Sequence, residues 1–451
     1  MTLKKCDLIV LGAGTAGCLA AYGAAKEGLS KVVLLDRKPK EMIGKKICGD
    51  GIGLKHLELL ESLGFPIKEN NIIANLIKTA HLVSPDKEKD YKIPTQNQLA
   101  IIERHKFGQV ILDEALKAGV SLNDEIIFND FERKNNNIVI NTSSKNGEVI
   151  KYEAPLLVDA SGINSKIREN FNEFGTDAIV QDDEQYYCYR EICQVEELPE
   201  YYQDSAVFEF GYETTRGGYI WFFSRGNNSL NMGSGIPKSW IKELSPKDVY
   251  QKEIAPRFKI KQIDDFGGGF VPTRHPIPTH VKDNIILIGD AGAIVNPLHG
   301  GGLSASLASR YIAGKIAAKY VPAERVKEED LWTFNLQINE RYGKRYSLLD
   351  LYRILLQNIP DKELNHAFIE EYLPLGMIFY AREYDLLLNL SRQLSEVWQT
   401  IPNERFELLP DCIEKINNLT SKYPQSSEDL PRWAAEYNKT YKDYQAKIEI
   451  R

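Results

Sequence analysis

Three glycines near the N-terminus and one acid beyond them have the types and spacing that bind a dinucleotide. Gly12 allows a tight turn, Gly14 lets the backbone approach a pyrophosphate, and Gly17 lets the following helix pack closely. The start of that helix presents free N–H groups and a partial positive charge to phosphates. Asp36 follows about 20 residues later, where an acid accepts ribose hydroxyls. The competing interpretation is an ordinary glycine turn.

A second group, far along the chain, predicts the other end of the same ligand. Asp290 follows an apolar run and is placed to accept a hydrogen bond from a ribityl hydroxyl. Gly301 and Gly302 then open a helix at Leu303, whose N–H groups and dipole would stabilise the anionic ring of a reduced flavin. The two segments together fit FAD better than any other dinucleotide. The alternative here is a glycine loop before a core helix.

Regular elements are placed to hold both groups. Four apolar runs predict strands buried on both faces of a parallel sheet. They cover residues 8–11, 32–35, 156–159 and 285–288. Helices are predicted after the first glycine loop, from near Arg104 to Gly119, and from Leu303 to about Lys319. A small meander is predicted at 126–131, 138–142 and 149–152.

An antiparallel sheet with an aromatic face is predicted between these parts, at 186–237. Tyr219, Trp221 and Phe223 share one face of a strand, and Phe208, Phe210 and Tyr212 alternate in the same way. Beyond residue 331 the chain is predicted to be helical. The predicted fold class is α/β: a Rossmann-like FAD-binding domain, an inserted antiparallel β-sheet substrate domain and a C-terminal helical region. The expected boundaries are 1–80, 98–172 and 284–330 for FAD, 81–97 and 173–283 for the sheet, and 331–451 for the helices.

Composition limits the classes of function. The chain has 451 residues and a net charge of −7 without a basic run, which argues against nucleic-acid binding. Its six cysteines are scattered with no CxxC pair, which favours a reducing cytoplasm and no metal site. Neither a signal peptide nor an apolar stretch long enough to span a bilayer is recognised. We therefore expect a cytoplasmic protein, at most peripheral on a membrane.

Several motifs resemble the geranylgeranyl reductase family, within the p-hydroxybenzoate hydroxylase superfamily of flavoproteins. The archaeal enzymes that saturate isoprenoid lipid chains are the most similar, and the resemblance covers nearly the whole chain. The motifs are Gly12–Gly17, Ile47–Asp50, Glu103–Arg104, Val158–Gly162, Tyr219–Phe223, Gly233–Gly235 and Gly289–Leu303.

The resemblance implies a set of FAD contacts. With the other glycines of the same motifs, the expected cofactor-binding residues are Gly12, Gly14, Ala16, Gly17, Asp36, Cys48, Gly49, Asp50, Arg104, Asp290, Gly301, Gly302 and Leu303. Two positions depart from the pattern. Ser224 stands where the family's aromatic motif has proline, and Ser161-Gly162 stands where the hydroxylases have Asp-Gly, which weakens the expectation that NAD(P)H docks as it does in hydroxylases.

Four residues are candidates for catalysis, each with a plainer interpretation. Tyr219 and Trp221 would line the substrate cavity and stabilise developing positive charge, or they are core aromatics. Cys48 would steer or protonate the substrate near the flavin, or it is a small buried thiol. His299 could donate a proton, although a structural hydrogen bond is the more ordinary role of a lone histidine.

The resemblance implies a reductase that saturates isolated double bonds of geranylgeranyl chains. The substrate would be an isoprenoid lipid or geranylgeranyl diphosphate, and the reductant NAD(P)H or a reduced ferredoxin. Gly267-Gly268-Gly269 does not lead to a helix, so no second dinucleotide motif is recognised and an electron-donor protein is a credible partner. We expect a monomer or weak oligomer. The alternatives are a flavin monooxygenase or halogenase of the same fold, and a non-catalytic prenyl-binding protein.

Overall fold

The predicted buried strands lie side by side in a six-stranded sheet. In the computed structural model, which describes residues 2–169, 173–322, 325–381, 383–401 and 403–449, this sheet is parallel except for its edge strand β17. Its order is β17 (Val281–Lys282), β18 (Ile285–Leu287), β11 (Leu157–Asp159), β2 (Leu8–Leu11), β3 (Val32–Leu35) and β7 (Ser121–Asn123). The predicted strands are confirmed, with β11 and β18 each one residue shorter than expected.

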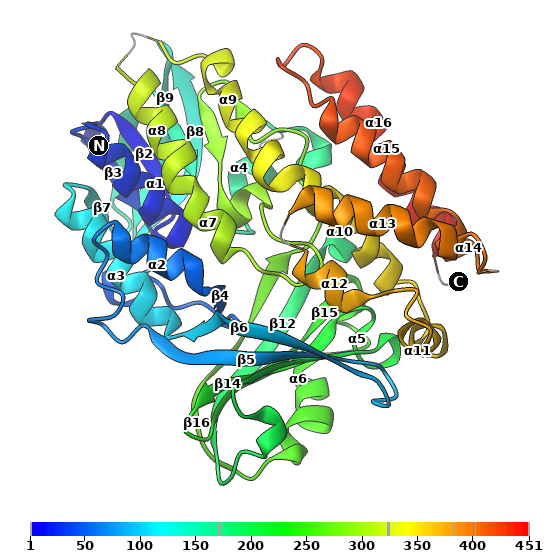
Figure 1. Ribbon diagram of the computed structural model, residues 1–451. Coiled ribbons are helices and arrows are strands. Elements are labelled where there is room, and N and C mark those ends of the chain that lie inside the picture. The colour runs from blue at the N-terminus through cyan, green and yellow to red at the C-terminus, as the bar shows by residue number, and fades with distance from the viewer. Residues whose placement is uncertain (1, 170–172, 323–324, 382, 402, 450–451) are drawn as a thin grey trace.

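Helices rich in small residues cover this sheet. Helix α1 (Thr15–Lys26) packs against α3 (Arg104–Lys117) and α7 (Leu303–Ser309), which continues through a π-helical turn into α8 (Lys315–Tyr320). A side chain at Gly314 would lie 2.9 Å from the backbone nitrogen of Ala24, so the two helices touch almost backbone to backbone. Figure 1 shows α1, α7 and α8 together beside the sheet, with α2 (Leu54–Ser62) next to α3.

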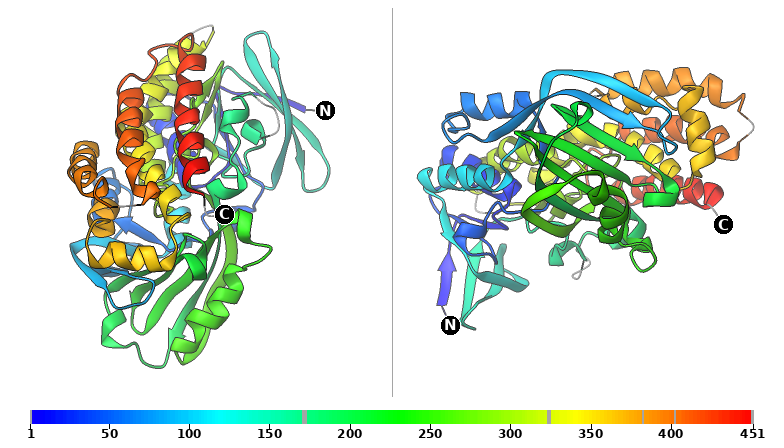
Figure 2. Two further views of the ribbon diagram at one scale, coloured as in Figure 1. Left: turned by 90° about the vertical axis from the view of Figure 1, so that its right-hand side faces the viewer. Right: turned by 90° about the horizontal axis from the view of Figure 1, so that it is seen from below.

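A four-stranded sheet flanks this layer and contains the predicted meander. Its order is β1 (Thr2–Lys5), β10 (Val149–Ala154), β9 (Asn137–Ser144) and β8 (Ile126–Lys134). Strand β1 runs parallel to β10, whereas the meander strands are antiparallel. In Figure 2 this sheet projects from the molecule next to the N-terminus, away from the C-terminal helices.

The aromatic residues lie on an eight-stranded sheet. Its order is β16 (Ile260–Pro272), β12 (Gln185–Val195), β15 (Ser229–Pro237), β14 (Tyr219–Gly226), β13 (Ser205–Phe210), β5 (Ile73–Val83), β6 (Asp90–Ile102) and β4 (Gly51–Gly53). All neighbours are antiparallel except β13 and β5. Strands β5 and β6 belong to this sheet over their whole length, and the domain boundaries expected at 81 and 97 stay a prediction.

Tyr212 departs from the expected alternation. Strand β13 ends at Phe210, and Tyr212 begins the short helix α5 (Tyr212–Thr215). The carboxylate of Asp361 accepts hydrogen bonds from the backbone N–H groups of Tyr212 (2.5 Å) and Glu213 (3.3 Å). A distant acid therefore caps the helix, which the local period-two pattern could not indicate.

The C-terminal region is helical, as predicted. Its helices are α9 (Glu328–Ile338), α10 (Lys344–Leu356), α11 (Asp361–Ile369), α12 (Leu375–Tyr380), α13 (Tyr384–Trp398), α14 (Glu404–Glu407), α15 (Leu409–Ser421) and α16 (Leu430–Ile448). Two smaller helices, α4 (Lys166–Glu169) and α6 (Pro246–Val249), precede this region. Figures 1 and 2 show α13, α15 and α16 packed together above the eight-stranded sheet. Among the residues described, none of the helices is both long and apolar enough to cross a membrane.

A buried ionic network holds the helices to the rest of the molecule. Asp350 on α10 is fully buried and accepts hydrogen bonds from Arg353 Nε (2.5 Å) and from the ring of His275 (2.8 Å), which follows β16. The His275 ring stacks on Tyr441 of α16 at 3.8 Å. Burial alone would raise the pKa of Asp350, but Arg353 and His275 outweigh it and hold that pKa well below its usual range.

We predict that Asp350→Asn lowers the free energy of unfolding by about 3–5 kcal/mol, because it leaves the Arg353 guanidinium buried without its counter-charge. Since the folded-state pKa of Asp350 is depressed, its stabilising contribution is present above the unfolded pKa of about 3.9 and is lost as pH falls through the folded value. Chemical denaturation at pH 7 and at lower pH measures both effects. Asp443→Asn, exposed on α16, is the control, and equal midpoints for the two variants would contradict the prediction.

Candidate active site

The first glycine loop is built from backbone contacts that exclude side chains. A Cβ at Gly12, which has φ +100°, would lie 2.4 Å from the carbonyl oxygen of Ala160, the residue that follows β11. A Cβ at Gly17 would lie 1.9 Å from the carbonyl oxygen of Gly12, so α1 sits directly on the turn. A Cβ at Gly14, by contrast, would meet open space. The loop thus packs tightly on the protein side and leaves room at Gly14, the position next to a pyrophosphate.

Asp36 stands beside this loop at the end of β3. Its carboxylate accepts hydrogen bonds from the backbone N–H groups of Ala13 (2.6 Å) and Lys38 (2.8 Å). The two donors orient the carboxylate next to the glycine turn, where an adenosine ribose binds in this type of fold. Ala16, in the first turn of α1, is buried under Gly289. A Cβ at Gly289 would lie 2.9 Å from the Ala16 methyl group. The two glycine segments therefore meet in space, although more than half of the chain separates them.

Arg104 supplies the test of whether an anionic cofactor fits. Its Nη2 donates to the hydroxyl of Thr15 in the glycine loop (2.9 Å), whereas its Nε and Nη1 are buried with no partner in the described part of the chain. A buried guanidinium N–H without an acceptor is costly, and a phosphate is the acceptor that guanidinium geometry matches best. The unpaired donors next to the glycine loop therefore fit the pyrophosphate of FAD.

Asp290 lies in a turn at the end of β18, and we call the region between the first glycine loop, Gly12–Gly17, and this turn the flavin slot. Its carboxylate pairs with Lys46 Nζ at 2.5 Å, and the fully buried Arg168 donates to the carbonyl oxygens of Asp290 (3.1 Å) and Ala291 (2.8 Å). A Cβ at Gly302 would lie 3.3 Å from Asp290 Oδ1, and the helix α7 begins immediately afterwards at Leu303. The acid, the glycine and the helix start thus lie together, and their role at the ribityl and pyrimidine end of a flavin stays a prediction.

The segment from Ile47 to Asp50 joins the slot to the aromatic sheet. Asn231 on β15 is fully buried, and its amide donates to the carbonyl oxygen of Cys48 and to Asp50 Oδ2, both at 2.8 Å. The same amide accepts a hydrogen bond from Trp221 Nε1 at 3.0 Å. A Cβ at Gly49 would lie 2.6 Å from the ring of Phe223, so this glycine lies flat on the aromatic ring. Sequence reasoning missed Asn231, because nothing local marks it.

The two candidate aromatics lie together and face the second glycine segment. The rings of Tyr219 and Trp221 are 6.0 Å apart, and the Tyr219 hydroxyl donates to the carbonyl oxygen of His299 (2.8 Å). Opposite Trp221, a Cβ at Gly233 would lie 2.5 Å from the indole, so the neighbouring strand makes room for it. Phe379 of α12 was also missed by sequence reasoning; its ring lies 5.2 Å from that of Phe208 and 5.4 Å from that of His299.

His299 and Cys48 lie near these aromatics, and both have pKa values shifted from those of the free side chains. Burial and the charge of Arg345 lower the pKa of His299 to about 4, so its ring is neutral at pH 7. Its Nδ1 accepts a hydrogen bond from the Gly301 N–H (3.1 Å), which leaves the ring proton on Nε2. Burial, followed by the nearby Asp50, raises the pKa of the Cys48 thiol. Cys48 is therefore a thiol and not a thiolate nucleophile.

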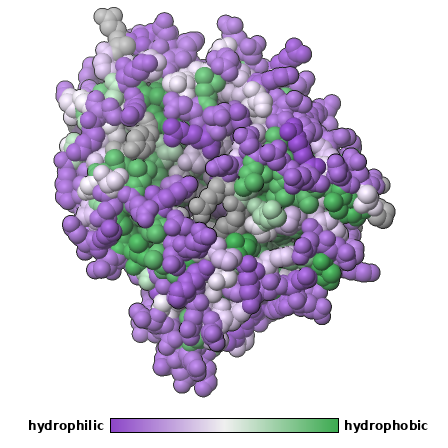
Figure 3. All heavy atoms as spheres, in the orientation of Figure 1, coloured by the Kyte–Doolittle hydropathy of each residue, from purple (hydrophilic) through white to green (hydrophobic). Residues whose placement is uncertain are grey.

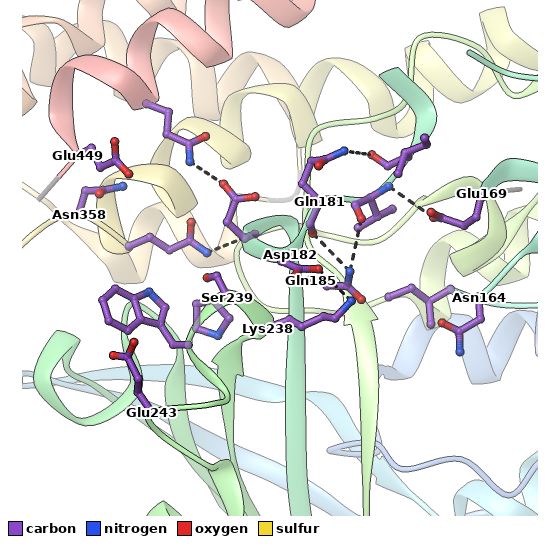
Figure 4. Close-up of a pocket in the computed structure, with 18 of the residues that line it drawn as sticks. Asn164, Glu169, Gln181, Asp182, Gln185, Lys238, Ser239, Glu243, Asn358 and Glu449 are labelled. Atoms are coloured by element: carbon purple, nitrogen blue, oxygen red, sulfur yellow. Dashed lines mark hydrogen bonds and ion pairs between the residues drawn. The ribbon is translucent and has the colours of Figure 1, made fainter. Parts of the chain in front are cut away.

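A separate cleft lies elsewhere, and its chemistry does not suit a flavin. The cavity, of about 1070 Å³, is lined by residues from the loop after β11, the end of β15 and the ends of α10 and α16 (Figure 4). None of the expected cofactor residues lines it. Two lysines face five acids there: Lys166, Lys238, Glu169, Asp182, Asp183, Glu243 and Glu449. The excess of carboxylates would repel a pyrophosphate. In the described residues, no group of three His, Cys, Asp or Glu side chains could hold a metal ion.

The comparisons with known proteins agree with this geometry. Residues 184–271 match the model of the geranylgeranyl reductase catalytic domain, and residues 7–164 match that of the FAD-dependent oxidoreductases. A digeranylgeranylglycerophospholipid reductase of Sulfolobus acidocaldarius is 29% identical over 98% of both chains. The chain is therefore similar to geranylgeranyl reductases over nearly its whole length. A second reductase of the same name, from Methanothrix thermoacetophila, is 27% identical over 80% of this chain and 90% of its own.

Solved structures show the same fold. A geranylgeranyl bacteriochlorophyll reductase-like protein from Thermoplasma acidophilum has a TM-score of 0.71 at 19% identity, covering 99% of this chain and 100% of its own. The myxobacterial chondrochloren halogenase has a TM-score of 0.63 at 16% identity, with 81% and 89% covered. The protein is thus a flavin-dependent oxidoreductase, and its α/β fold is shared with halogenases.

We predict that Arg104→Ala weakens FAD binding by about ten- to a hundredfold, because a hydrogen bond to a charged group contributes about 1.5–3 kcal/mol. Titration of the apoprotein with FAD, followed by the quenching of flavin fluorescence, measures the dissociation constant. Lys106→Ala, exposed on the same helix, removes a charge without touching the slot and should bind like the wild type. An Arg104 variant with unchanged affinity would show that the unpaired guanidinium does not hold the cofactor.

Proposed function

We propose that this protein is an FAD-dependent reductase that saturates isolated C=C bonds of geranylgeranyl chains. The substrate class is an isoprenoid membrane lipid of the archaeal type, with geranylgeranyl diphosphate as the smaller alternative. The single observation that carries the proposal is the juxtaposition of the flavin slot with a buried aromatic face through the segment Ile47–Asp50. The names of the relatives point to the same substrate.

The aromatic face suits a substrate without a polarising carbonyl. FAD in its reduced form would supply hydride from the ring end of the slot. Protonation of a trisubstituted alkene develops positive charge on the tertiary carbon, and aromatic faces stabilise such charge by about 1–2 kcal/mol each when water is excluded. Tyr219 and Trp221 are in position to do so, and Phe379 covers the same face from α12. We propose that the expected cofactor-binding residues, from Gly12 in the first glycine loop to Leu303 at the start of α7, contact FAD.

The cofactor's external reductant is NAD(P)H or a reduced ferredoxin. The glycine run on β16 supports a protein donor, because it belongs to a strand and packs against Ile47 and Tyr187 and so does not form a second dinucleotide turn. Cells that lack the ferredoxin but keep NAD(P)H would separate the two donors. Continued saturation of the lipid would indicate NAD(P)H, and loss of saturation would indicate ferredoxin. The strand location of these glycines is also the reason that no helix dipole is available there for a second pyrophosphate.

We also propose a cytoplasmic protein that contacts the membrane surface, because its substrate class is a membrane lipid. Figure 3 shows apolar surface over the C-terminal helices on the right of this face. Large exposed apolar side chains come from this region, including Met377 on α12 (60% exposed) and Leu386 on α13 (57% exposed). Such side chains bury readily at the boundary between headgroups and acyl chains. Helix α12 thus has Phe379 on its inner face and Met377 on its outer one.

Anaerobic reduction tests the function directly. We predict that protein carrying FAD, reduced with dithionite without dioxygen, converts geranylgeranyl lipid to products that are heavier in steps of about two daltons per saturated bond by mass spectrometry. A halogenase or monooxygenase, which the shared fold of the halogenases keeps as the second candidate, would require dioxygen. Product formed only with dioxygen would therefore overturn the reductase. A non-catalytic prenyl-binding protein would bind the lipid without changing its mass.

We predict that Trp221→Leu slows alkene saturation by about tenfold, whereas Trp221→Phe retains most of the rate. The reason is that leucine removes an aromatic face worth about 1–2 kcal/mol, while phenylalanine keeps one. Stopped-flow reoxidation of the reduced protein by lipid, in a single turnover, measures the step. Both variants lose the hydrogen bond to Asn231, so the pair separates the aromatic face from the bond. Equal rates for the two variants would argue for a core packing role.

A further inference from the structure

Asp50 is a buried carboxyl group with one oxygen left over. Only 1% of it is exposed, and its backbone has φ +65°, a left-handed conformation that is uncommon outside glycine. Its Oδ2 accepts the hydrogen bond from Asn231 at 2.8 Å. Its Oδ1 is buried with no hydrogen-bond partner in the described part of the chain. Burying such an oxygen without a partner is costly, so it marks a place where a further group belongs in the working complex.

The charged groups around Asp50 come from three elements. Arg190 on β12, Arg225 on β14 and Arg104 on α3 all act on it by charge, and Arg225 Nη1 lies 3.8 Å from Asp50 Oδ2. The Nε and Nη1 of Arg190 are themselves buried and unpartnered in the described residues, while its Nη2 donates to Asp265. Cys48 faces Asp50 from its own loop, with its sulfur 3.3 Å from the Asp50 backbone nitrogen. Burial outweighs the three arginines and raises the pKa of Asp50 to about 6.

The other proton-bearing groups beside the aromatic face are poor acids or bases at neutral pH. The pKa of His299 is lowered to about 4 by burial, so the imidazolium form is almost absent at pH 7. Burial raises the pKa of the Cys48 thiol and of the Tyr219 hydroxyl, so neither gives up its proton readily. A general acid works best when its pKa lies near the operating pH. Among these four groups, that condition holds for Asp50.

We propose that Asp50 is the catalytic acid that delivers the proton in alkene saturation, an inference that rests on the proposed function. The carboxylic acid gives its proton to one carbon of the double bond, and a C–H bond forms as the O–H bond breaks. The other carbon, left cationic, receives the hydride that the reduced flavin supplies. The alkene gains one proton and one hydride, the flavin is oxidised by two electrons, and Asp50 is left as a carboxylate. Solvent then returns its proton before the next turnover.

The surroundings of Asp50 suit this role. The carboxylate that forms is stabilised by the Asn231 amide and by the nearby guanidinium groups of Arg190 and Arg225. The same Asn231 holds Trp221 through its Nε1–H, so one amide positions both the acid and the aromatic face that stabilises the cationic carbon. In this proposal, Asp50 protonates the double bond close to Trp221, whose ring stabilises the positive charge on the other carbon.

The test is Asp50→Asn, which preserves the shape and the Asn231 contact but carries no acidic proton. We expect single-turnover alkene reduction to fall by about a hundredfold or more, within the range for removal of a general acid. The rate is measured with saturating FAD, and the reduction of the bound flavin by dithionite should stay near wild type. Glu103→Gln, which removes the half-buried partner of Arg225 nearby, is the control and should keep most of the rate. Asp50→Glu should recover part of the loss.

Two measurements on the wild type do not depend on the variant folding. The rate of alkene reduction should be greatest below about pH 6 and should fall as pH rises above it, because the acid must be protonated. Infrared difference spectra of the FAD-loaded protein without substrate should show a carboxylic-acid carbonyl band that disappears over the same pH range. That band should be absent in Asp50→Asn if the variant folds.

The outcomes separate this proposal from the proposed function. Wild-type protein that saturates lipid, with an Asp50→Asn variant that is equally fast, would overturn Asp50 as the acid and leave the reductase standing. A wild-type rate that does not change between pH 5 and 8 would do the same even if the variant cannot be obtained. Wild-type protein that saturates no lipid would overturn the proposed function, whatever the infrared band of Asp50 shows.

Discussion

Close backbone packing of the segment Lys45–Asp50 is the constraint on which the site depends. Ile47 packs on β16, where a Cβ at Gly267 would lie 2.8 Å from its side chain, and Gly49 lies flat on Phe223. Lys45 pairs with Asp265 on β16, and Lys46 with Asp290 on the parallel sheet. The segment is therefore wedged between the eight-stranded sheet and the end of the six-stranded one. A shift of the segment Lys45–Asp50 would move the Cys48 thiol, the Asp50 carboxyl group and the edge of the flavin slot together.

Buried charge is the second feature of the site. Buried arginines near the site include Arg104 over the glycine loop, Arg168 behind Asp290, and Arg190 near Asp50. Arg168 donates to the Glu169 carboxylate and to backbone carbonyl oxygens, whereas Arg104 and Arg190 keep unpaired N–H groups in the described structure. Since a folded protein pairs nearly all of its buried polar groups, the unpaired ones mark where ligand or water completes the interior. Both lie next to residues that the sequence associates with the cofactor.

The C-terminal helices cover the aromatic face that carries Tyr219 and Trp221. Phe379 on α12 packs edge-on against Phe208 and Phe210 and so keeps water from the face that carries Tyr219 and Trp221. Far from this contact, the pair of His275 and Asp350 fixes α10 and α16 against the end of β16. The C-terminal helices are thus anchored by the pair of His275 and Asp350, and they cover the aromatic face through Phe379. Exclusion of water matters here, because the attraction between a cation and an aromatic ring is strongest when both are desolvated.

Local sequence patterns predicted much of the fold. The apolar runs at Leu8–Leu11 and Val32–Leu35 became β2 and β3 without change, and the glycines and Asp36 lie where their spacing indicated. These patterns succeed because a buried parallel strand and a phosphate-binding turn depend on nearby residues. The resemblance to a family predicted that residues of the Cys48 loop contact the cofactor, and this stays a prediction. The alternation extended to Tyr212 was wrong, because Asp361, distant in sequence, caps a helix there.

By itself, the sequence determined the fold class and the apolar runs that form the parallel strands, and it predicted the residues at the two ends of a dinucleotide site. Only the tertiary structure decided that Asn231 links Trp221 to Asp50, that Phe379 covers the aromatic face, and that Asp50 keeps an unpaired oxygen. The physical reason is that hydrogen-bond partners and burial are properties of position in space. A residue's type fixes how many bonds it can make, but the surrounding chain fixes which of them are made and how readily it holds a proton.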